Sequence, residues 1–242
     1  MNKKRHLPWG TFINMGTVTV GSLIGMQLQQ IFPENIQLII FQAIGLGTLV
    51  LGIKMSLKIP DGYLLIFIFS LILGGVIGEM MGIKELLEGI GDAIKTSLNI
   101  ENDRFSEGLI TAFLLFCVGS MTIVGAIEEG LKGNKELLLI KSTLDGISSI
   151  AFASTYGVSV LFSIIPMLIF QGGITILAGN LRNFFTTTII DVLNAVGGAL
   201  IIAIGINLLN LGKMNIENLL PSLVVVVVLT WFKQKWTVEE GL

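Results

Sequence analysis

The sequence has 242 residues and little charge. Charged residues make up 13% of it, about half of the roughly 25% found in soluble domains. It has one cysteine, Cys117, and one histidine, His6, and its net charge is -2. One cysteine excludes an internal disulfide, and no Cys/His cluster has metal-ligand spacing. A chain without a basic face has no surface that binds phosphates, so we expect no nucleic-acid partner. We also expect no metal and no cofactor.

Apolar residues and glycines take the place of the missing charges. Hydrophobic residues make up 52% of the chain and the mean hydropathy is +0.84. Of the 242 residues, 29 are glycine, well above the usual share of about 7%. This composition predicts an all-α, polytopic bundle of transmembrane helices in contact with a lipid bilayer.

Apolar runs of about 20 residues mark eight predicted spans. They cover residues 10–29, 37–57, 62–82, 108–129, 139–157, 160–180, 187–208 and 218–234. Breakers separate several of them: Pro33-Glu34-Asn35, Pro60-Asp61-Gly62, Gly133-Asn134 and Gly212-Lys213. Residues 84–95 instead alternate apolar and charged positions at helical spacing, which predicts an amphipathic helix along the membrane or on the protein surface.

The placement of basic residues predicts the orientation of these spans. With both termini in the cytoplasm, eleven of the fifteen basic residues fall in cytoplasmic segments. These are Lys3, Lys4, Arg5, Lys54, Lys58, Lys132, Lys135, Lys141, Arg182, Lys233 and Lys235. Lys84, Lys95, Arg104 and Lys213 fall outside. The bias supports eight spans, because with seven the carboxy-terminal lysines would lie outside.

Glycine-rich spans contain a repeated signature. Ala43-Ile44-Gly45-Leu46-Gly47 leads to Gly52, and Ala195-Val196-Gly197-Gly198 leads to Gly205. Spans one to three therefore look like spans six to eight, and an offset of five spans would invert the second unit. Inverted three-span repeats are typical of secondary transporters. The alternative is compositional coincidence, since glycines also serve close helix packing.

These repeats organise one predicted transmembrane domain over residues 1–242. We expect a first repeat at 10–82, an external amphipathic linker at 83–107, a central helix pair at 108–157 and a second repeat at 160–234.

Polar residues at membrane depth gather in spans four and five. They include Ser120, Thr122, Glu129, Lys141, Ser142, Asp145 and Ser149. Lys141 and Asp145 are spaced i, i+4 and can pair on one helical face. Glu129 is expected near Lys141 across the short loop, so a carboxylate–lysine–carboxylate cluster could bind a cation or relay a proton. The same network could instead be structural.

Four amides lie in the predicted repeats: Asn14 and Gln171 in the first spans, and Gln42 and Asn194 in the second. Amides at matching positions could face each other near the midplane and form a binding site. Hydrogen bonding between helices explains them equally well.

Several motifs resemble a known family. They are the run from Cys117 to Gly130 with Gly125-Ala126-Ile127-Glu128-Glu129-Gly130 in it, Lys141-Ser142-Thr143-Leu144-Asp145-Gly146, Phe12-Ile13-Asn14, and Asn194-Ala195-Val196-Gly197-Gly198. The chain resembles the bacterial membrane-protein family labelled domain of unknown function 554, the YqgA/YdfK-like proteins. The resemblance implies a small polytopic inner-membrane protein, regarded as a possible transporter, and brings no activity with it. Ser120 stands where the family often has a proline.

The sequence predicts a secondary transporter or ion-conducting protein for a small ion or small polar solute. The alternative is a membrane scaffold or sensor that transports nothing. No enzyme signature is present, because no serine has a base at catalytic spacing and the glycine-rich stretches lie inside apolar helices. We expect the bacterial cytoplasmic membrane as the location, both termini in the cytoplasm, and a possible homodimer.

Overall fold

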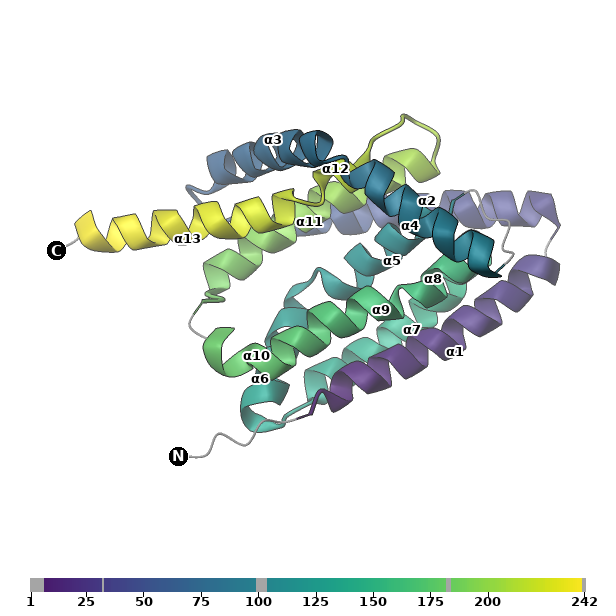
Figure 1. Cartoon of the computed structure of the whole chain (residues 1–242), viewed down its shortest axis with the longest axis horizontal. Helices are drawn as coiled ribbons and strands as arrows, with labels where there is room; N and C mark the ends of the chain where they lie inside the picture. Colours follow the sequence, from purple (N-terminus) through teal and green to yellow (C-terminus); the bar gives the residue numbers. More distant parts are fainter. Residues whose placement is uncertain (1–6, 32, 99–103, 182–183, 241–242) are drawn as a thin grey trace. The chain divides into compact units, whose positions relative to one another are not determined.

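A computed structural model describes residues 7–31, 33–98, 104–181 and 184–240. The described residues are almost entirely helical and contain no strand (Figure 1). The helices are α1 (Trp9–Ile31), α2 (Glu34–Ser56), α3 (Leu64–Met81), α4 (Ile83–Leu98), α5 (Phe105–Cys117), α6 (Ser120–Lys132), α7 (Glu136–Tyr156), α8 (Val158–Phe162), α9 (Ile164–Met167), the π-helix η1 (Leu168–Gly172), α10 (Gly173–Leu181), α11 (Thr187–Leu208), α12 (Ile216–Leu219) and α13 (Ser222–Glu240). The all-α prediction is confirmed.

Six helical segments among the described residues are long and apolar enough to cross a membrane. They are Leu38–Ser56, Leu64–Met81, Glu136–Tyr156, Val158–Leu181, Thr187–Leu208 and Ile216–Trp236. The bent pair α5–α6 makes up to seven. The first predicted span, α1, is not among them, because its threonines, glycines and Asn14 dilute its apolar residues. The count of eight stays a prediction.

The predicted breakers coincide with helix ends. α2 begins at Glu34, directly after Pro33, and the chain turns at Pro60-Asp61-Gly62 before α3. α6 ends at Lys132, and Gly133 follows with a φ of 71°. A glycine adopts this left-handed conformation without the steric cost of a side chain, so it ends helices readily.

The chain forms two compact units. Unit 1 contains Met1–Ile44 and Asn99–Asn183, and unit 2 contains Gly45–Leu98 and Phe184–Leu242. Each unit therefore combines an early and a late part of the chain.

In unit 1, α1 lies along α7 (Figure 1). Glycines allow the close approach: Gly21 faces the carbonyl oxygen of Gly146 and the hydroxyl of Ser149. A β-carbon on Gly25 would lie 2.8 Å from the β-carbon of Ala153. Small residues at such contacts let two backbones approach closely and gain van der Waals contact.

The fourth predicted span, 108–129, is not one straight helix. α5 ends at Cys117, α6 begins at Ser120, and their axes differ by 58°. Val118 and Gly119 interrupt the helix, and Gly119 is fully extended with φ -168° and ψ 153°. The pair is a broken span or a re-entrant loop. A proline is not needed for this break, since Ser120 occupies the position after the glycine.

The sixth predicted span, 160–180, is also irregular. It consists of α8, α9, η1 and α10, which together form the candidate span Val158–Leu181. The π-helical turn contains Gln171. A π-turn inside an α-helix is rare and often marks a functional site.

In unit 2, α2 and α11 meet through glycines. A β-carbon on Gly52 would lie 2.7 Å from the carbonyl oxygen of Gly198, and one on Gly198 would lie 2.7 Å from that of Gly52. α3 lies against α13 with Gly74 facing Ser222.

The predicted amphipathic helix is α4. Asn218 of α12 joins it to α3: the backbone N–H of Lys84 donates to Oδ1 of Asn218 at 2.8 Å, and Nδ2 of Asn218 donates to Oε2 of Glu79 at 2.6 Å. This amide fixes the corner between α3 and α4.

Candidate functional site

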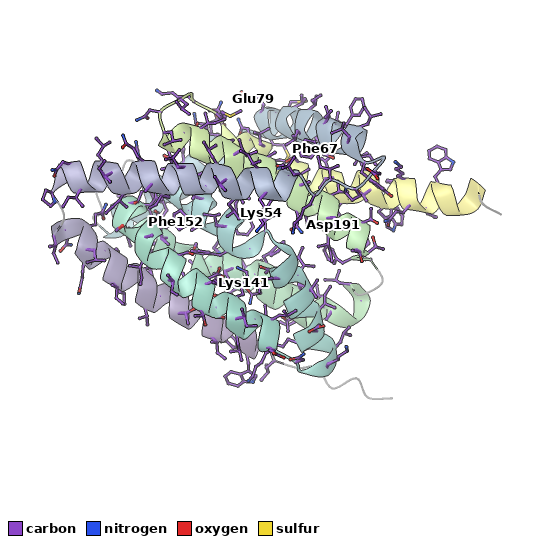
Figure 2. All side chains as sticks on the ribbon, turned by 180° about the vertical axis from the view of Figure 1, so that it is seen from behind. Lys54, Phe67, Glu79, Lys141, Phe152 and Asp191 are labelled. Carbon is purple, nitrogen blue, oxygen red and sulfur yellow. The ribbon has the colours of Figure 1, made fainter. Side chains whose placement is uncertain are left out.

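A polar stripe runs along α7, in unit 1. Lys141, Ser142, Asp145 and Ser149 are all buried, although the apolar residues Leu144 and Ile147 of the same helix are exposed. Figure 2 labels Lys141 on this helix. The helix therefore turns this stripe toward the protein and apolar residues such as Leu144 and Ile147 outward, as expected where the surroundings are lipid.

Lys141 and Asp145 form a buried ion pair. Nζ of Lys141 donates to Oδ1 of Asp145 at 2.7 Å and to Oδ2 at 2.6 Å. Lys141 is 7% exposed and Asp145 is 5% exposed. Desolvating two charges is costly, and their mutual attraction offsets this cost only when the geometry is good. The bidentate contact meets that condition.

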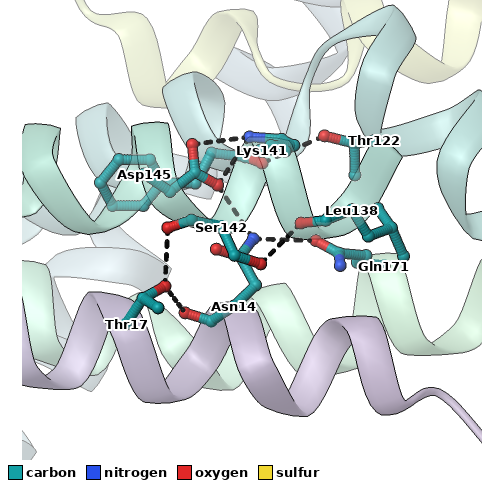
Figure 3. Close-up of polar contacts among 9 residues, drawn as sticks. Asn14, Thr17, Thr122, Leu138, Lys141, Ser142, Asp145 and Gln171 are labelled. Carbon is teal, nitrogen blue, oxygen red and sulfur yellow. Dashed lines mark hydrogen bonds and ion pairs between the residues drawn. The ribbon is translucent and has the colours of Figure 1, made fainter. Parts of the chain in front are cut away.

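Asn14 of α1 extends the pair into a network over three elements (Figure 3). Its Nδ2 donates to Oδ2 of Asp145 at 2.9 Å and to Oε1 of Gln171 at 3.2 Å. Asn14 and Gln171 are completely buried. The structure thus brings together four of the residues that the sequence singled out, from α1, α7 and η1.

Thr17 holds α1 against α7 beside this network. Its Oγ1 lies 2.8 Å from the carbonyl oxygen of Ser142 and 2.9 Å from that of Asn14, so its single hydrogen is shared between them. Oγ of Ser142 donates to the carbonyl oxygen of Leu138 at 2.6 Å (Figure 3). Sequence reasoning missed Thr17. Its place one turn after Asn14, on the same helical face, was the available signal.

The break between α5 and α6 lies in the same unit. Oγ1 of Thr122 donates to the carbonyl oxygen of Phe116 at 3.2 Å, which satisfies one of the acceptors that the break leaves without a helical partner. Thr122 is buried. The side chain of Ser120 lies outside the described part of the structure.

Glu129 contacts α1. Its Oε1 accepts a hydrogen bond from the backbone N–H of Gly10 at 2.7 Å, and the side chain is 2% exposed. The first turn of a helix has unpaired N–H groups and a positive partial charge, both of which favour a carboxylate. The sequence predicted Lys141 as the neighbour of Glu129 and did not predict the hydrogen bond from Gly10. Nothing in the residue types indicated that α1 begins beside α6.

Among the described residues, no hydrogen bond links the remaining candidates to the Asn14–Lys141–Asp145–Gln171 network. Ser149 donates from Oγ to the carbonyl oxygen of Gly146 at 2.8 Å, at the crossing with Gly21. Gln42 is exposed on α2. Asn194 is buried on α11 in unit 2, and its Oδ1 has no hydrogen-bond partner among the described residues.

An apolar groove flanks η1 on unit 1, with a volume of about 390 Å³. Its lining residues are Phe113, Pro166, Ile169, Phe170, Gly173, Ile174, Leu177 and Leu181. None of them carries a polar side chain, so the groove is separate from the polar network.

Comparison with known proteins gives the chain a family. The sequence profile described as "Protein of unknown function (DUF554)" matches residues 9–231. The chain belongs to this family. The resemblance seen in its motifs is therefore confirmed over nearly the whole chain.

Two relatives match along almost their full length. The chain is 34% identical over 219 residues to the "Uncharacterized membrane protein YdfK" of Bacillus subtilis (strain 168), which covers 90% of this chain and 93% of the relative. It is 28% identical over 235 residues to the "Uncharacterized protein YqgA" of Escherichia coli (strain K12), which covers 94% and 98%. No solved structure matches the chain. The apolar helices and the first relative are consistent with a membrane protein.

Proposed function

We propose that this member of the family is a secondary transporter or ion-conducting protein for a small ion or small polar solute. The observation that carries the proposal is the buried Lys141–Asp145 pair, tied through Asn14 to Gln171. Ionisable residues inside membrane segments are expensive and usually mark a transport path or a proton relay.

Irregular helices beside the ion pair support this function. α5–α6 is broken at Val118 and Gly119, and the segment with Gln171 contains a π-turn. Substrate sites of secondary transporters are typically built from discontinuous helices, because their ends present free backbone groups to the ligand.

A scaffold or sensor without transport is the second candidate. Asp145 receives hydrogen bonds from both Lys141 and Asn14, and α1 packs closely on α7 through Gly21 and Gly25. A carboxylate that is hydrogen-bonded in this way can hold helices together without binding a solute.

Flux measurements in proteoliposomes separate the two candidates. We expect Lys141→Met and Asp145→Asn to abolish the flux of the transported ion or solute. The control is the exposed pair on α4, Lys84 and Glu88, which has the same i, i+4 spacing and a separation of 3.9 Å. Lys84→Met and Glu88→Gln should leave the flux intact. Unchanged flux in all four variants would remove the pair from the mechanism and favour the scaffold.

The proposal includes eight spans in the bacterial cytoplasmic membrane, with α1 as the first and both termini in the cytoplasm. Apart from Lys141, which lies inside the fifth predicted span, ten basic residues fall in cytoplasmic segments and four outside, and this bias supports the orientation. α1 is 23 residues long, enough to cross a hydrocarbon core at 1.5 Å per residue. Three of its polar residues, Thr11, Asn14 and Ser22, are buried against the protein, so its composition understates how apolar its outer face is in this part.

The contacts of α2 with α11 support inverted repeats. Gly52 meets Gly198, and Gly205 lies close to Gly45, whose carbonyl oxygen would be 3.1 Å from a β-carbon on Gly205. Gly198 and Gly205 follow Gly45 and Gly52 at the same separation along the chain. Exchanging the two helices therefore maps one contact onto the other, as a two-fold axis between inverted repeats would do.

A further inference from the structure

Three buried polar atoms near the crossing of α1 with η1 have no hydrogen-bond partner among the described residues. They are Oγ1 of Thr11, Oδ1 of Asn14 and Nε2 of Gln171. All three side chains are 0% exposed. Asn14 and Gln171 are hydrogen-bonded to each other, and a β-carbon on Gly172 would lie 3.7 Å from Cγ2 of Thr11. Thr11 is one helical turn before Asn14 and shares its face.

The partners of the two amides fix which of their atoms remain free. Both hydrogens of the Asn14 amide are used, because Nδ2 donates to Asp145 and to Gln171. Turning the amide over would place Oδ1 against the carboxylate of Asp145, which repels it. Oε1 of Gln171 must likewise face Asn14. The site therefore offers one free acceptor, Oδ1 of Asn14, and one free donor, Nε2 of Gln171, with the Thr11 hydroxyl able to do either.

This set of groups selects the chemistry of an occupant. A bare cation would bind Oδ1 of Asn14 but be repelled by the N–H groups of Gln171, and a bare anion would have the opposite difficulty. A hydroxyl group donates and accepts through a single oxygen, which suits one free acceptor and one free donor on two amides that are hydrogen-bonded to each other. The adjacent Lys141 and Asp145 neutralise each other, so the network gives no reason for a net charge on the ligand.

We infer that Thr11, Asn14 and Gln171 bind the hydroxyl oxygen of a small uncharged molecule, either water or a polyol of the size of glycerol. The inference rests on the proposed function, since it names the solute class of the same site. Of the two solute classes in the proposed function, a small ion and a small polar solute, the inference selects the small polar solute.

The first test is the occupancy of the site in a structure of the full chain at about 2 Å, determined with glycerol and again with rubidium bromide. We expect an oxygen within about 2.7–3.2 Å of both Oδ1 of Asn14 and Nε2 of Gln171. It is a water if the density is a single peak in both structures and a polyol if it extends only with glycerol. An anomalous peak of rubidium or bromide at this position, or amides turned to new protein partners, would overturn the inference.

The second test is flux in proteoliposomes, measured for water, glycerol, rubidium and protons. Thr11→Val removes the hydroxyl but keeps the shape, and we expect about a fivefold to tenfold loss of water or glycerol flux, the equivalent of one hydrogen bond. Thr11→Ser should retain the flux. The matched control is Thr230→Val in α13, an equally buried threonine in unit 2 whose Oγ1 also has no partner among the described residues.

The outcomes separate this inference from the proposed function. Ion flux without water or glycerol flux would support a transporter and overturn the inference. A bridging oxygen in the structure without any flux would support the inference and count against transport.

Discussion

At the scale of single residues, Asp145 joins the α7 stripe to α1. Its carboxylate accepts from Lys141 on its own helix and from Asn14 on another. A buried pair of this kind adds little stability compared with apolar residues of the same size, yet removing one partner is strongly destabilising because the other charge stays buried and alone.

Lys141→Met should therefore lower the free energy of unfolding by about 3–5 kcal/mol. The double variant Lys141→Met/Asp145→Leu should be closer to the wild type, since it leaves no unpaired charge. Thermal unfolding in detergent measures both. Equal losses in the single and double variants would contradict this account of the pair.

Much of the residue network could be predicted from the sequence. The i, i+4 spacing of Lys141 and Asp145 sufficed for their pairing, and the positions of Asn14 and Gln171 in two similar segments suggested that they meet. The partner of Glu129 could not be predicted in the same way. It is the backbone N–H of Gly10, and a backbone group in a distant helix leaves no pattern in the residue types.

At the scale of the helices, glycine contacts decide how closely α1 and α7 approach. Gly21 faces the backbone of Gly146, whereas Gly16 on the same helix has no atom within 4 Å of where a β-carbon would be. Substitution of Gly16 therefore tests helix propensity alone, and substitution of Gly21 tests helix propensity together with packing.

Gly16→Ala should be neutral or stabilise the protein by up to about 1 kcal/mol, because alanine favours a helix over glycine. Gly21→Ala should destabilise it by about 1–3 kcal/mol, because the methyl group forces α1 away from α7. Melting temperatures of the two variants in detergent check the difference. A stabilising Gly21→Ala would show that the helices do not pack in this way.

The helix breaks were harder to predict than the helices. Apolar composition predicted a continuous span over 108–129, since valine and glycine are both common within membrane helices. The extended backbone at Gly119 and the π-turn at Gln171 depend on tertiary contacts. Hydropathy therefore cannot predict either of them. The amphipathic α4, by contrast, follows directly from its periodic pattern.

At the scale of the whole molecule, the orientation in the membrane can be tested with single cysteines. In a Cys117→Ala background, Asn2→Cys should resist a membrane-impermeant maleimide in intact cells, and Leu211→Cys should react. Leu211 is 70% exposed in the loop after α11. Labelling of both Asn2→Cys and Leu211→Cys from outside would put an even number of spans between the two sites, which contradicts eight spans with α1 as the first.

The proposed two-fold relation between α2 and α11 makes a second prediction. Gly52→Val and Gly198→Val should destabilise unit 2 to a similar degree, by about 1–3 kcal/mol each, because each side chain would meet the opposite backbone. Gly47→Val is the control, since no atom lies within 4 Å of its β-carbon position. A large difference between the first two variants would contradict the symmetry.

The division into two units was not predictable from the repeats. The predicted repeats are consecutive blocks, 10–82 and 160–234, and they stay a prediction, whereas both compact units draw on early and late segments. Similarity between segments shows which parts of a chain share an ancestor or a shape, and says nothing of which parts fold together.

This interleaving has a consequence for synthesis. Asn14 and Asp145 are 131 residues apart, and ribosomes add about 5–20 residues per second. α1 therefore leaves the ribosome on the order of 10 s before α7, the helix that buries its polar face. In the proposed arrangement, with α1 as the first span, Asn14 and Thr17 lack during that interval the partners that satisfy their polar groups. The insertion machinery or the membrane interface would then hold this first helix until the middle of the chain arrives.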